Sequence, residues 1–469
     1  MLTKKIILRA AGAGLAAIVL LTAQPLSAQT SSESEQLQKL EQAVNQLQKR
    51  NAELEQEVSG LKKRTSWAPV VGAEGKTKTE VTYDGKTYVE KAVVEEKAPV
   101  YVQQRGPELK LVLGGFIQFN AESGDVFAFQ GNFGQTAIND RFLLRRARIN
   151  MTGDYAEQFD FKIEGDFEQN DGTNGGRRDF SGTDIFINWH QFPSAQVKAG
   201  QYKAPFGLEQ LTPDTSLYTI ERSIATGAIT PERQIGIQLW GKPFTNIWPE
   251  QKDLVTYYAG VFNGNGRNIN VNDNNNFMFV GRLELQPLKD FAGKGSFLKL
   301  GGDVLNSRDN AGVNISQAGN LLVNADGSLS SFTLPSAAQR TAWSVDAWLE
   351  LGPFDLIGEY LQETVLPRTV PGATPAFSAF NSDGFYVTGA YYILPKKLQA
   401  VVQWQFLNPG QKGNDGIPSI LGGLNYYIRG DSVKLMVNYI HTWSDFRQAN
   451  PQFGDDQFDE VLMRAQVMF

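Results

Sequence analysis

Arginine and lysine residues gather at two places in this chain, where their side chains could hold small anions. Arg145, Arg146 and Arg148 lie within four consecutive residues, and Lys203 follows Gly200-Gln201-Tyr202. A guanidinium group donates hydrogen bonds in a planar fork that matches phosphate oxygens. An ion passage needs several such sites in series, each strong enough to admit the ion and weak enough to release it. Arg145, Arg146, Arg148 and Lys203 have side chains of this chemistry, and so do Arg222 and Arg233, in or beside the segment 204–232.

Residue types that carry enzymatic chemistry are sparse. His190 and His441 are the two histidines, they lie far apart in the sequence, and there is no cysteine. No spacing typical of a metal site stands out. Gly264-Asn265-Gly266 lacks the strand-to-helix context of a phosphate-binding loop. The sequence predicts neither an enzyme nor a cofactor or metal site.

The elements that would position the basic residues are strands. From Leu111 onward, sixteen segments are amphipathic or rich in β-formers. They lie at 111–120, 141–153, 157–167, 183–192, 195–203, 233–241, 253–263, 277–287, 296–305, 340–351, 353–363, 383–393, 397–407, 418–429, 432–443 and 458–469. In 398–406, for example, apolar residues alternate with glutamines, which predicts strands with one apolar and one polar face.

The connections between these segments alternate in length. Eight are long and rich in Gly, Asn, Asp and Ser, and the seven between them are shorter. This pattern predicts an all-β fold, a 16-stranded antiparallel transmembrane β-barrel with turns in the periplasm and long loops outside. Sixteen strands leave an aqueous lumen. The strand Val461–Phe469 would close the ring, with its terminal aromatic as an assembly signal.

The third long loop, 204–232, is the candidate constriction. Its apolar residues would not usually be exposed on a surface loop, so we expect it to fold into the lumen. The alternative is a loop that contacts another subunit or caps the barrel. On strand 141–153, Arg146 and Arg148 share the lumen parity, whereas Arg145 has the lipid parity and should lie near the rim or at a bulge.

The charged residues that alternate strand positions assign to the lumen face argue against a uniformly basic lumen. Eight basic residues take lumen positions: Arg146, Arg148, Lys162, Lys198, Arg282, Lys299, Lys434 and Arg464. Ten acidic residues do so: Asp160, Glu164, Asp166, Asp184, Glu284, Asp303, Asp346, Glu350, Asp355 and Glu359. Anion selectivity would therefore require basic residues clustered at the narrowest point. Aromatic residues near segment ends would form lipid-facing girdles: Tyr391, Tyr392, Tyr426, Tyr427, Trp240 and Trp248.

The N-terminal quarter has a different organisation. Residues 1–28 form an expected secretory signal peptide, with Lys4, Lys5 and Arg9 before an apolar run. Its removal would take the net charge from -6 to -9, which argues against nucleic-acid binding. Residues 29–64 carry a heptad seam and predict a periplasmic α-helical coiled coil, or alternatively a solvated helix packed on a domain. Residues 65–109 predict a linker with a possible hairpin at Asp84-Gly85, and 110–469 the barrel.

The Arg145–Arg148 run, the run Gly200-Gln201-Tyr202-Lys203-Ala204-Pro205-Phe206-Gly207-Leu208-Glu209 and the terminal Phe469 together resemble the phosphate-selective porin O and P family. The resemblance covers 110–469. It implies a homotrimeric channel in the outer membrane of a Gram-negative-type bacterium, with Arg and Lys side chains leading phosphate or other small inorganic anions to a constriction. The positions that match by motif, and are therefore the candidate anion-binding residues, are Arg145, Arg146, Arg148 and Lys203, with Arg222 and Arg233 as further candidates in or beside the third loop. The heptad rule favours a two-stranded coil instead of a trimer. Two alternatives stay open: a general or cation-leaning porin, and a tether whose coiled coil links the outer-membrane lipid layer to the cell wall.

Overall fold

The computed structural model describes residues 78–83, 88–93, 101–105, 109–133, 140–167, 180–316, 321–369 and 374–469. The expected signal peptide at 1–28 and coiled coil at 29–64 lie outside these residues. The chain divides into two compact units, Met1–Glu96 and Lys97–Phe469. In the first unit, β1 (Lys78–Tyr83) and β2 (Tyr88–Val93) pair antiparallel with Tyr83 opposite Tyr88. The two strands lie on either side of Asp84-Gly85, where a hairpin was expected, and residues 84–87 themselves lie outside the described residues.

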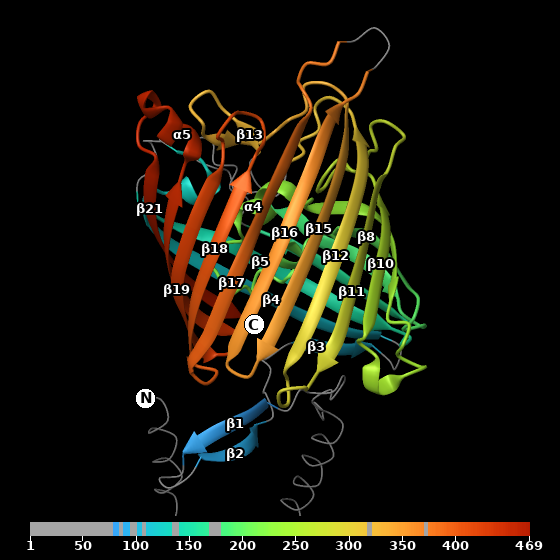
Figure 1. Cartoon of the computed structure of the whole chain (residues 1–469). Coiled ribbons are helices and arrows are strands. Elements are labelled where there is room, and N and C mark those ends of the chain that lie inside the picture. Colours follow the sequence, from blue (N-terminus) through green and yellow to red (C-terminus); the bar gives the residue numbers. More distant parts are fainter. Residues whose placement is uncertain are drawn as a thin grey trace, which may run out of the picture. The chain divides into compact units, whose positions relative to one another are not determined.

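The second unit is a closed antiparallel barrel, as predicted, and its wall consists of sixteen strands, which we name staves (Figure 1). The staves are β4 (Leu109–Gly124), β5 (Arg141–Tyr155), β6 (Phe159–Asp166), β7 (Ser181–Trp189), β8 (Gln196–Lys203), β9 (Arg233–Gly241), β10 (Val255–Phe262), β11 (Met278–Lys289), β12 (Phe297–Asp309), β15 (Ala338–Leu351), β16 (Phe354–Pro367), β17 (Phe380–Leu394), β18 (Leu398–Asn408), β19 (Ile417–Arg429), β20 (Val433–Trp443) and β21 (Gln457–Met468). Each lies within a few residues of a segment predicted from the alternation.

The ring closes where β21 pairs with β4, with Met468 opposite Phe116. Gly115 and Phe469 exchange both backbone hydrogen bonds, each at 3.0 Å. A Cβ at Gly115 would lie 2.4 Å from the Arg148 carbonyl oxygen, so glycine permits this close approach. Beyond the end of β21, β3 (Tyr101–Arg105) pairs with the start of β4. The segment expected to be a linker therefore also adds one strand to the barrel sheet.

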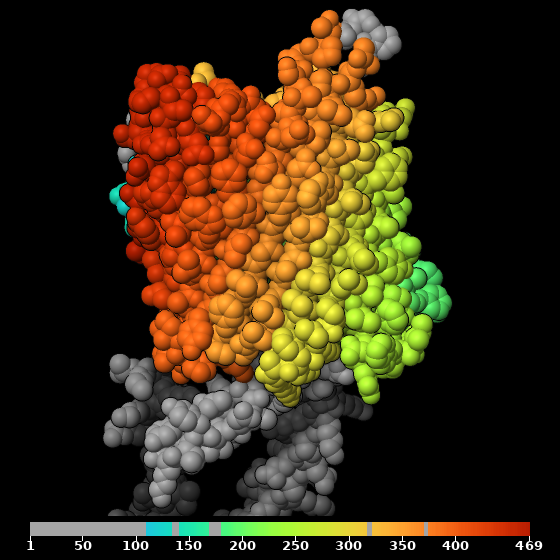
Figure 2. Space-filling model, in the orientation of Figure 1, coloured from blue at the N-terminus to red at the C-terminus, as the bar shows by residue number. Residues whose placement is uncertain are grey.

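Side chains alternate between the two faces of the wall. On β20, Leu435 and Tyr439 point outward and are about half exposed, whereas Lys434 and Asn438 point inward and are buried. Figure 2 shows the outer side of the wall from β12 to β21 as one continuous surface. An isolated polar group in such a face would be costly in lipid, which explains why the outward positions are so strongly apolar.

The expected aromatic girdle is only partly right. Tyr391, Tyr426 and Trp248 are 47 to 52% exposed and lie on the outside. Tyr427 is buried and donates its hydroxyl hydrogen to Gln399 Oε1, and Trp240 donates its ring N–H to the buried Asn188 Oδ1. Neighbouring residues on one strand face opposite sides, so a pair such as Tyr426-Tyr427 cannot both face lipid.

Short turns at one rim and long loops at the other join the staves, as predicted. The long loops carry η1 (Ala128–Gln130), α3 (Leu208–Leu211), α4 (Ile224–Ile229), the small hairpin β13 (Leu322–Val323) and β14 (Leu329–Ser330), α5 (Asp445–Ala449) and η3 (Pro451–Phe453); η2 (Pro249–Gln251) lies in the longest of the short connections. In the described part of the chain, no helix is long and apolar enough to span a membrane.

Candidate functional site

The loop 204–232, which joins β8 to β9, lies inside the barrel and not on its outside. Its first residues are fixed to one part of the wall: Gly207 N donates to Asp303 Oδ2 at 3.0 Å, and Leu208 and Glu209 donate to the two oxygens of Glu359. Its later residues reach other staves, since Ile220 N donates to Asn438 Oδ1 at 2.7 Å on β20. The prediction that the loop enters the lumen is confirmed.

The geometry of the run 200–209 has local physical causes. Gly200 has φ +130°, and a Cβ there would meet the Ile185 carbonyl oxygen at 2.3 Å. Phe206 is fully buried, and Gly207 takes φ +82°, a left-handed conformation that favours glycine. Lys203 donates to the Gln210 and Thr212 carbonyl oxygens at 2.7 and 3.2 Å. The run therefore turns the chain from β8 into the lumen, and the hydrogen bonds of Lys203 hold the start of the loop in place.

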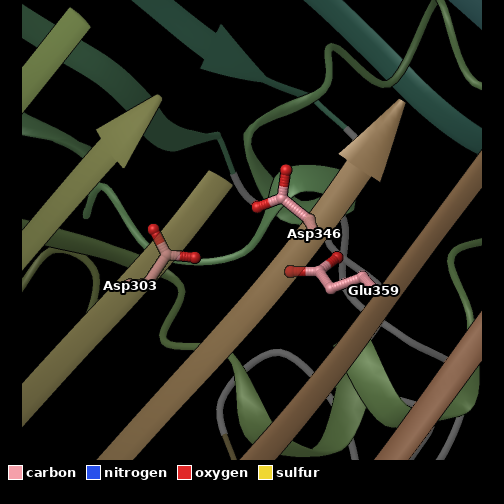
Figure 3. A group of neighbouring side chains, drawn as sticks. All are labelled: Asp303, Asp346 and Glu359. Carbon is pink, nitrogen blue, oxygen red and sulfur yellow. The ribbon is translucent and has the colours of Figure 1, made fainter. Parts of the chain in front are cut away.

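Three carboxylates, Asp303, Asp346 and Glu359, offer oxygens that all lie within 4.8 Å of one another (Figure 3). The guanidinium of Arg282 is 2.8 Å from Asp303 and 2.7 Å from Asp346. Glu359 accepts the two loop amides described above. These donors already satisfy the cluster, so its structural role is to anchor the loop where it leaves β8.

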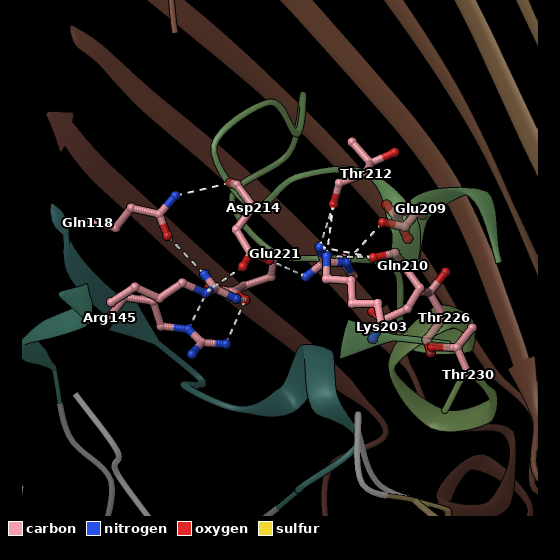
Figure 4. Close-up of polar contacts among 12 residues, drawn as sticks. Gln118, Arg145, Lys203, Glu209, Gln210, Thr212, Asp214, Glu221, Thr226 and Thr230 are labelled. Atoms are coloured by element: carbon pink, nitrogen blue, oxygen red, sulfur yellow. Dashed lines mark hydrogen bonds and ion pairs between the residues drawn. The ribbon is translucent and has the colours of Figure 1, made fainter. Parts of the chain in front are cut away.

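Arg145 lies at a bulge, one of the two places that its parity allowed. Gln118 is opposite Arg146 and Phe119 is opposite Leu144, so Arg145 has no partner on β4. Its guanidinium reaches Glu221 of the loop with two hydrogen bonds of 2.9 Å, and its side chain is 34% exposed (Figure 4). The bulge converts an outward position into a loop contact.

Asp214, on the loop, is a common partner of three arginines. Its carboxylate lies 2.6 Å from Arg148 and from Arg222, and 3.5 Å from Arg146. Burial would raise the pKa of Asp214, but Arg146, Arg222 and Arg148 outweigh it and hold the pKa well below its usual range. The carboxylate is therefore charged at neutral pH and binds the middle of the loop to β5.

Glu221 has the same role further along the loop. Besides Arg145, it lies 2.5 Å from Arg464 on β21 and 3.9 Å from Arg146. Burial opposes its ionisation, but Arg145 and Arg464 hold the pKa of Glu221 below its ordinary value. Arg146 and Arg464, only 8 and 1% exposed as side chains, face the loop more than the open lumen.

Arg233, the last candidate, belongs to the neighbouring section of the wall. It lies 2.6 Å from Asp184 and 4.0 Å from Glu164, beside Lys162, which contacts the same two acids. Between the loop and the wall from β21 through β4 to β9, eight basic side chains thus lie beside five carboxylates. The basic ones are Arg145, Arg146, Arg148, Lys162, Lys203, Arg222, Arg233 and Arg464; the carboxylates are Glu164, Asp166, Asp184, Asp214 and Glu221. This group, which we name the basic cluster, carries an excess of positive charge. The three carboxylates at the start of the loop, Asp303, Asp346 and Glu359, form a separate acidic group with Arg282.

Amide side chains of the wall hold the loop backbone, a feature that the sequence reasoning missed. Three of them donate an amide N–H to a loop carbonyl oxygen: Gln118 to Asp214, Asn425 to Tyr218 and Gln466 to Thr215. A fourth, Gln405, accepts a hydrogen bond from the backbone N–H of Ile224, and all four bonds are 2.8 to 3.0 Å long. Lumen-facing Gln and Asn at alternate strand positions were the available signal. Buried amides are costly unless they are paired, so such a row predicts a backbone packed against it.

The described parts of a second long loop, 310–316 and 321–337, also contribute buried apolar residues. Leu321, Leu329 and Leu334 are almost fully buried, and Leu329 N donates to the Gly131 carbonyl at 2.7 Å. Gln411 donates to the Leu321 carbonyl from a further loop. With Phe206, Ile229, Phe262 and residues of several other staves, these side chains form one apolar cluster at the long-loop end. The same signal that drew attention to 204–232, apolar residues within a loop, was present here.

Comparison with known families decides the relationship. A family model described as phosphate-selective porin O and P matches residues 118–469. The chain belongs to the phosphate-selective porin O and P family. It is thus an outer-membrane β-barrel channel, and this family membership confirms the resemblance inferred from the 145–148 and 200–209 runs. A search of curated proteins finds no match.

Solved structures share the fold of this porin at low identity. An anion-selective porin from Comamonas acidovorans has a TM-score of 0.52 and 12% identity, covering 77% of this chain and 100% of that one. The channel DcaP of Acinetobacter baumannii has a TM-score of 0.51 and 12% identity, covering 78 and 99%. A trimer form of OmpT from Vibrio cholerae has a TM-score of 0.50 and 10% identity, covering 77 and 100%. At this identity the likeness concerns the fold alone.

Proposed function

We propose that this porin conducts small anions, with phosphate or polyphosphate as its candidate solutes. The observation that carries the proposal is the basic cluster, in which eight basic side chains meet five carboxylates beside the inward loop. A site of excess charge at a narrow point concentrates counter-ions more than the average charge of the lumen does. The family description and the similar anion-selective porin agree with this proposal.

Reversal potentials in asymmetric KCl, with and without added phosphate, test the proposal on the full-length protein in planar bilayers. We expect a preference for chloride and a block of chloride current by phosphate. Arg145→Gln should reduce both, because Arg145, at 34%, has the most exposed side chain among the arginines of the basic cluster. Arg308→Gln, on the exposed outer side of β12, is the matched control. A cation preference without phosphate block would refute the proposal.

A cation-leaning porin is the second candidate, and the acidic residues outside the basic cluster favour it. Glu284, Glu350 and Asp160 are half-buried on the lumen face near the short-turn rim. The reversal potentials above distinguish the two candidates directly. Because an anion must pass both groups, the more constricted one should dominate.

For assembly, we propose a homotrimer in outer-membrane lipid with residues 29–64 as a periplasmic coiled coil. The trimer form of the similar OmpT supports the homotrimer, and the heptad seam supports the coiled coil. Deleting 29–64 tests whether the coiled coil binds the cell wall: envelope detachment with unchanged conductance would favour a tether. Loss of the trimer on native gels would instead assign the coiled coil to assembly.

A further inference from the structure

Two lysines on the lumen face have surroundings unlike those of the basic cluster. Lys198 Nζ lies 4.6 Å from the ring centre of Phe186 and 5.6 Å from that of Trp240. Lys299 Nζ lies 4.8 Å from the ring centre of Phe297 and 5.6 Å from that of Trp348. Asp160 and Asp184 are near enough to Lys198 to act on it electrostatically, but within the described residues neither ammonium has a carboxylate within 4.0 Å. An ammonium that faces rings keeps more of its capacity to bind an anion than one in an ion pair.

The rings beside these lysines belong to the lumen and not to a lipid-facing girdle. Trp240 donates its ring N–H inward to Asn188, and Trp348 donates to Asp355 Oδ1 at 3.2 Å, and both acceptors are buried. Leu239, the sequence neighbour of Trp240, is exposed on the outer face. Both tryptophans and both lysines are half-buried, so a portion of each remains accessible from the lumen.

Each lysine has an aromatic neighbourhood that extends beyond one ring. Trp240 stacks on Tyr258 with ring centres 5.9 Å apart and planes 5° from parallel. Trp348 meets Tyr218 edge to face, at 6.4 Å and 86°. Since Tyr218 is on the inward loop 204–232, the Lys299 site lies beside that loop.

We propose that Lys198 with Trp240, and Lys299 with Trp348, form two binding sites for small aromatic carboxylates. The carboxylate would pair with the ammonium while the ring packs on the exposed indole surface. Stacking on an indole and pairing with an ammonium require a flat ring and a negative charge in the same small molecule. Benzoate is the simplest such molecule.

The two sites act separately. Lys198 is on β8 and Lys299 on β12, four strand spacings or about 19 Å apart along the wall. Benzoate is too short to bridge them, so it would bind one site and then the other. This goes beyond the proposed conduction of inorganic anions, whose basic cluster uses other residues.

The test measures block of chloride current by benzoate, and by cyclohexanecarboxylate as a probe of equal charge without an aromatic ring. In the wild-type porin, benzoate should block at a lower concentration. Trp348→Leu should raise the half-blocking concentration of benzoate about 2- to 10-fold and leave that of cyclohexanecarboxylate nearly unchanged. Trp343→Leu, on the exposed outer face of the same strand, should change neither.

Lys299→Met should weaken the block by both carboxylates, because it removes the charge and not the ring. Equal block by the two probes in the wild type would overturn the proposal. So would a variant with both Trp240→Leu and Trp348→Leu that conducts normally and is blocked by benzoate as before, since it has lost the indole of each site. The reversal potential of the same variants is a separate measurement. A porin without anion preference that still shows ring-dependent block would refute only the proposed function.

Discussion

Replacing Glu221 by glutamine should increase the anion preference of the channel. Glu221 is the carboxylate that Arg145 and Arg464 share, at 2.9 and 2.5 Å. The substitution removes one negative charge from the basic cluster and retains an oxygen that accepts hydrogen bonds. The unbalanced charge then acts on ions that pass the loop.

The size of the effect follows from Coulomb's law. An ion about 6 Å from the former carboxylate gains about 0.7 kcal/mol at the dielectric constant of water, and about 0.4 kcal/mol after screening in roughly 0.1 M salt. Because the change favours the anion and disfavours the cation, the permeability ratio should rise about fourfold. A lower local dielectric constant would increase this value.

Reversal potentials in a KCl gradient measure the ratio. Combining Glu221→Gln with Arg464→Met restores the net charge and should return the ratio to the wild-type value. Asp383→Asn, on the outer face of β17, is a control that should have no effect. An unchanged or reduced anion preference in Glu221→Gln, at wild-type conductance, would refute the reasoning that this carboxylate limits the charge of the constriction.

Three further substitutions or conditions probe the anchoring of the long loops. The folded structure holds the pKa values of Asp214 and Glu221 below normal. Their contribution to stability is therefore present above the unfolded-state pKa and is lost only as the pH falls through the lower folded-state pKa. Conductance measured between pH 8 and 5 should therefore show no release of the loop 204–232. Arg282→Met leaves the buried Asp303 and Asp346 without their cation, which should destabilise the barrel by about 3–5 kcal/mol and lower its thermal unfolding midpoint; a midpoint equal to the wild type would contradict the anchoring role. Replacing 313–334 by a short Gly–Ser linker removes some of the apolar cluster and should raise single-channel conductance, whereas an unchanged conductance would mean that this loop does not restrict the path.

The barrel was predictable because it depends on local periodicity. Alternation of apolar and polar residues gives the strands and their faces, and the lengths of the connections give their direction and number. Alternation also assigned Arg145 to the lipid face, where a charge is unfavourable, and in the structure Arg145 lies at a β-bulge. Such information is carried by neighbouring residues and needs no knowledge of what lies across the lumen.

The partners of the candidate site residues could not be predicted in this way. Arg146 and Arg148 were correctly placed on the lumen face, but their pairing with Asp214 depends on how a loop of 29 residues folds back across the barrel. No periodicity encodes that path. Trp240 was assigned to the lipid face from its place near a strand end, although its parity with Gln238 already put it inside.

The dependence of selectivity on salt should separate the two kinds of basic residue in this porin. The arginines of the basic cluster act on a passing ion mainly through their summed field, because carboxylates already occupy much of their hydrogen-bonding capacity. Raising the salt from 0.1 to 1 M shortens the screening length from about 10 to about 3 Å. The anion preference should therefore fall strongly. Block by benzoate at Lys299 involves direct contact and ring packing, so its half-blocking concentration should change much less. If the anion preference and the benzoate block weaken in parallel, the lysine–aromatic sites act by charge alone. If neither weakens, the basic cluster binds ions in direct contact and its carboxylates do not shield it.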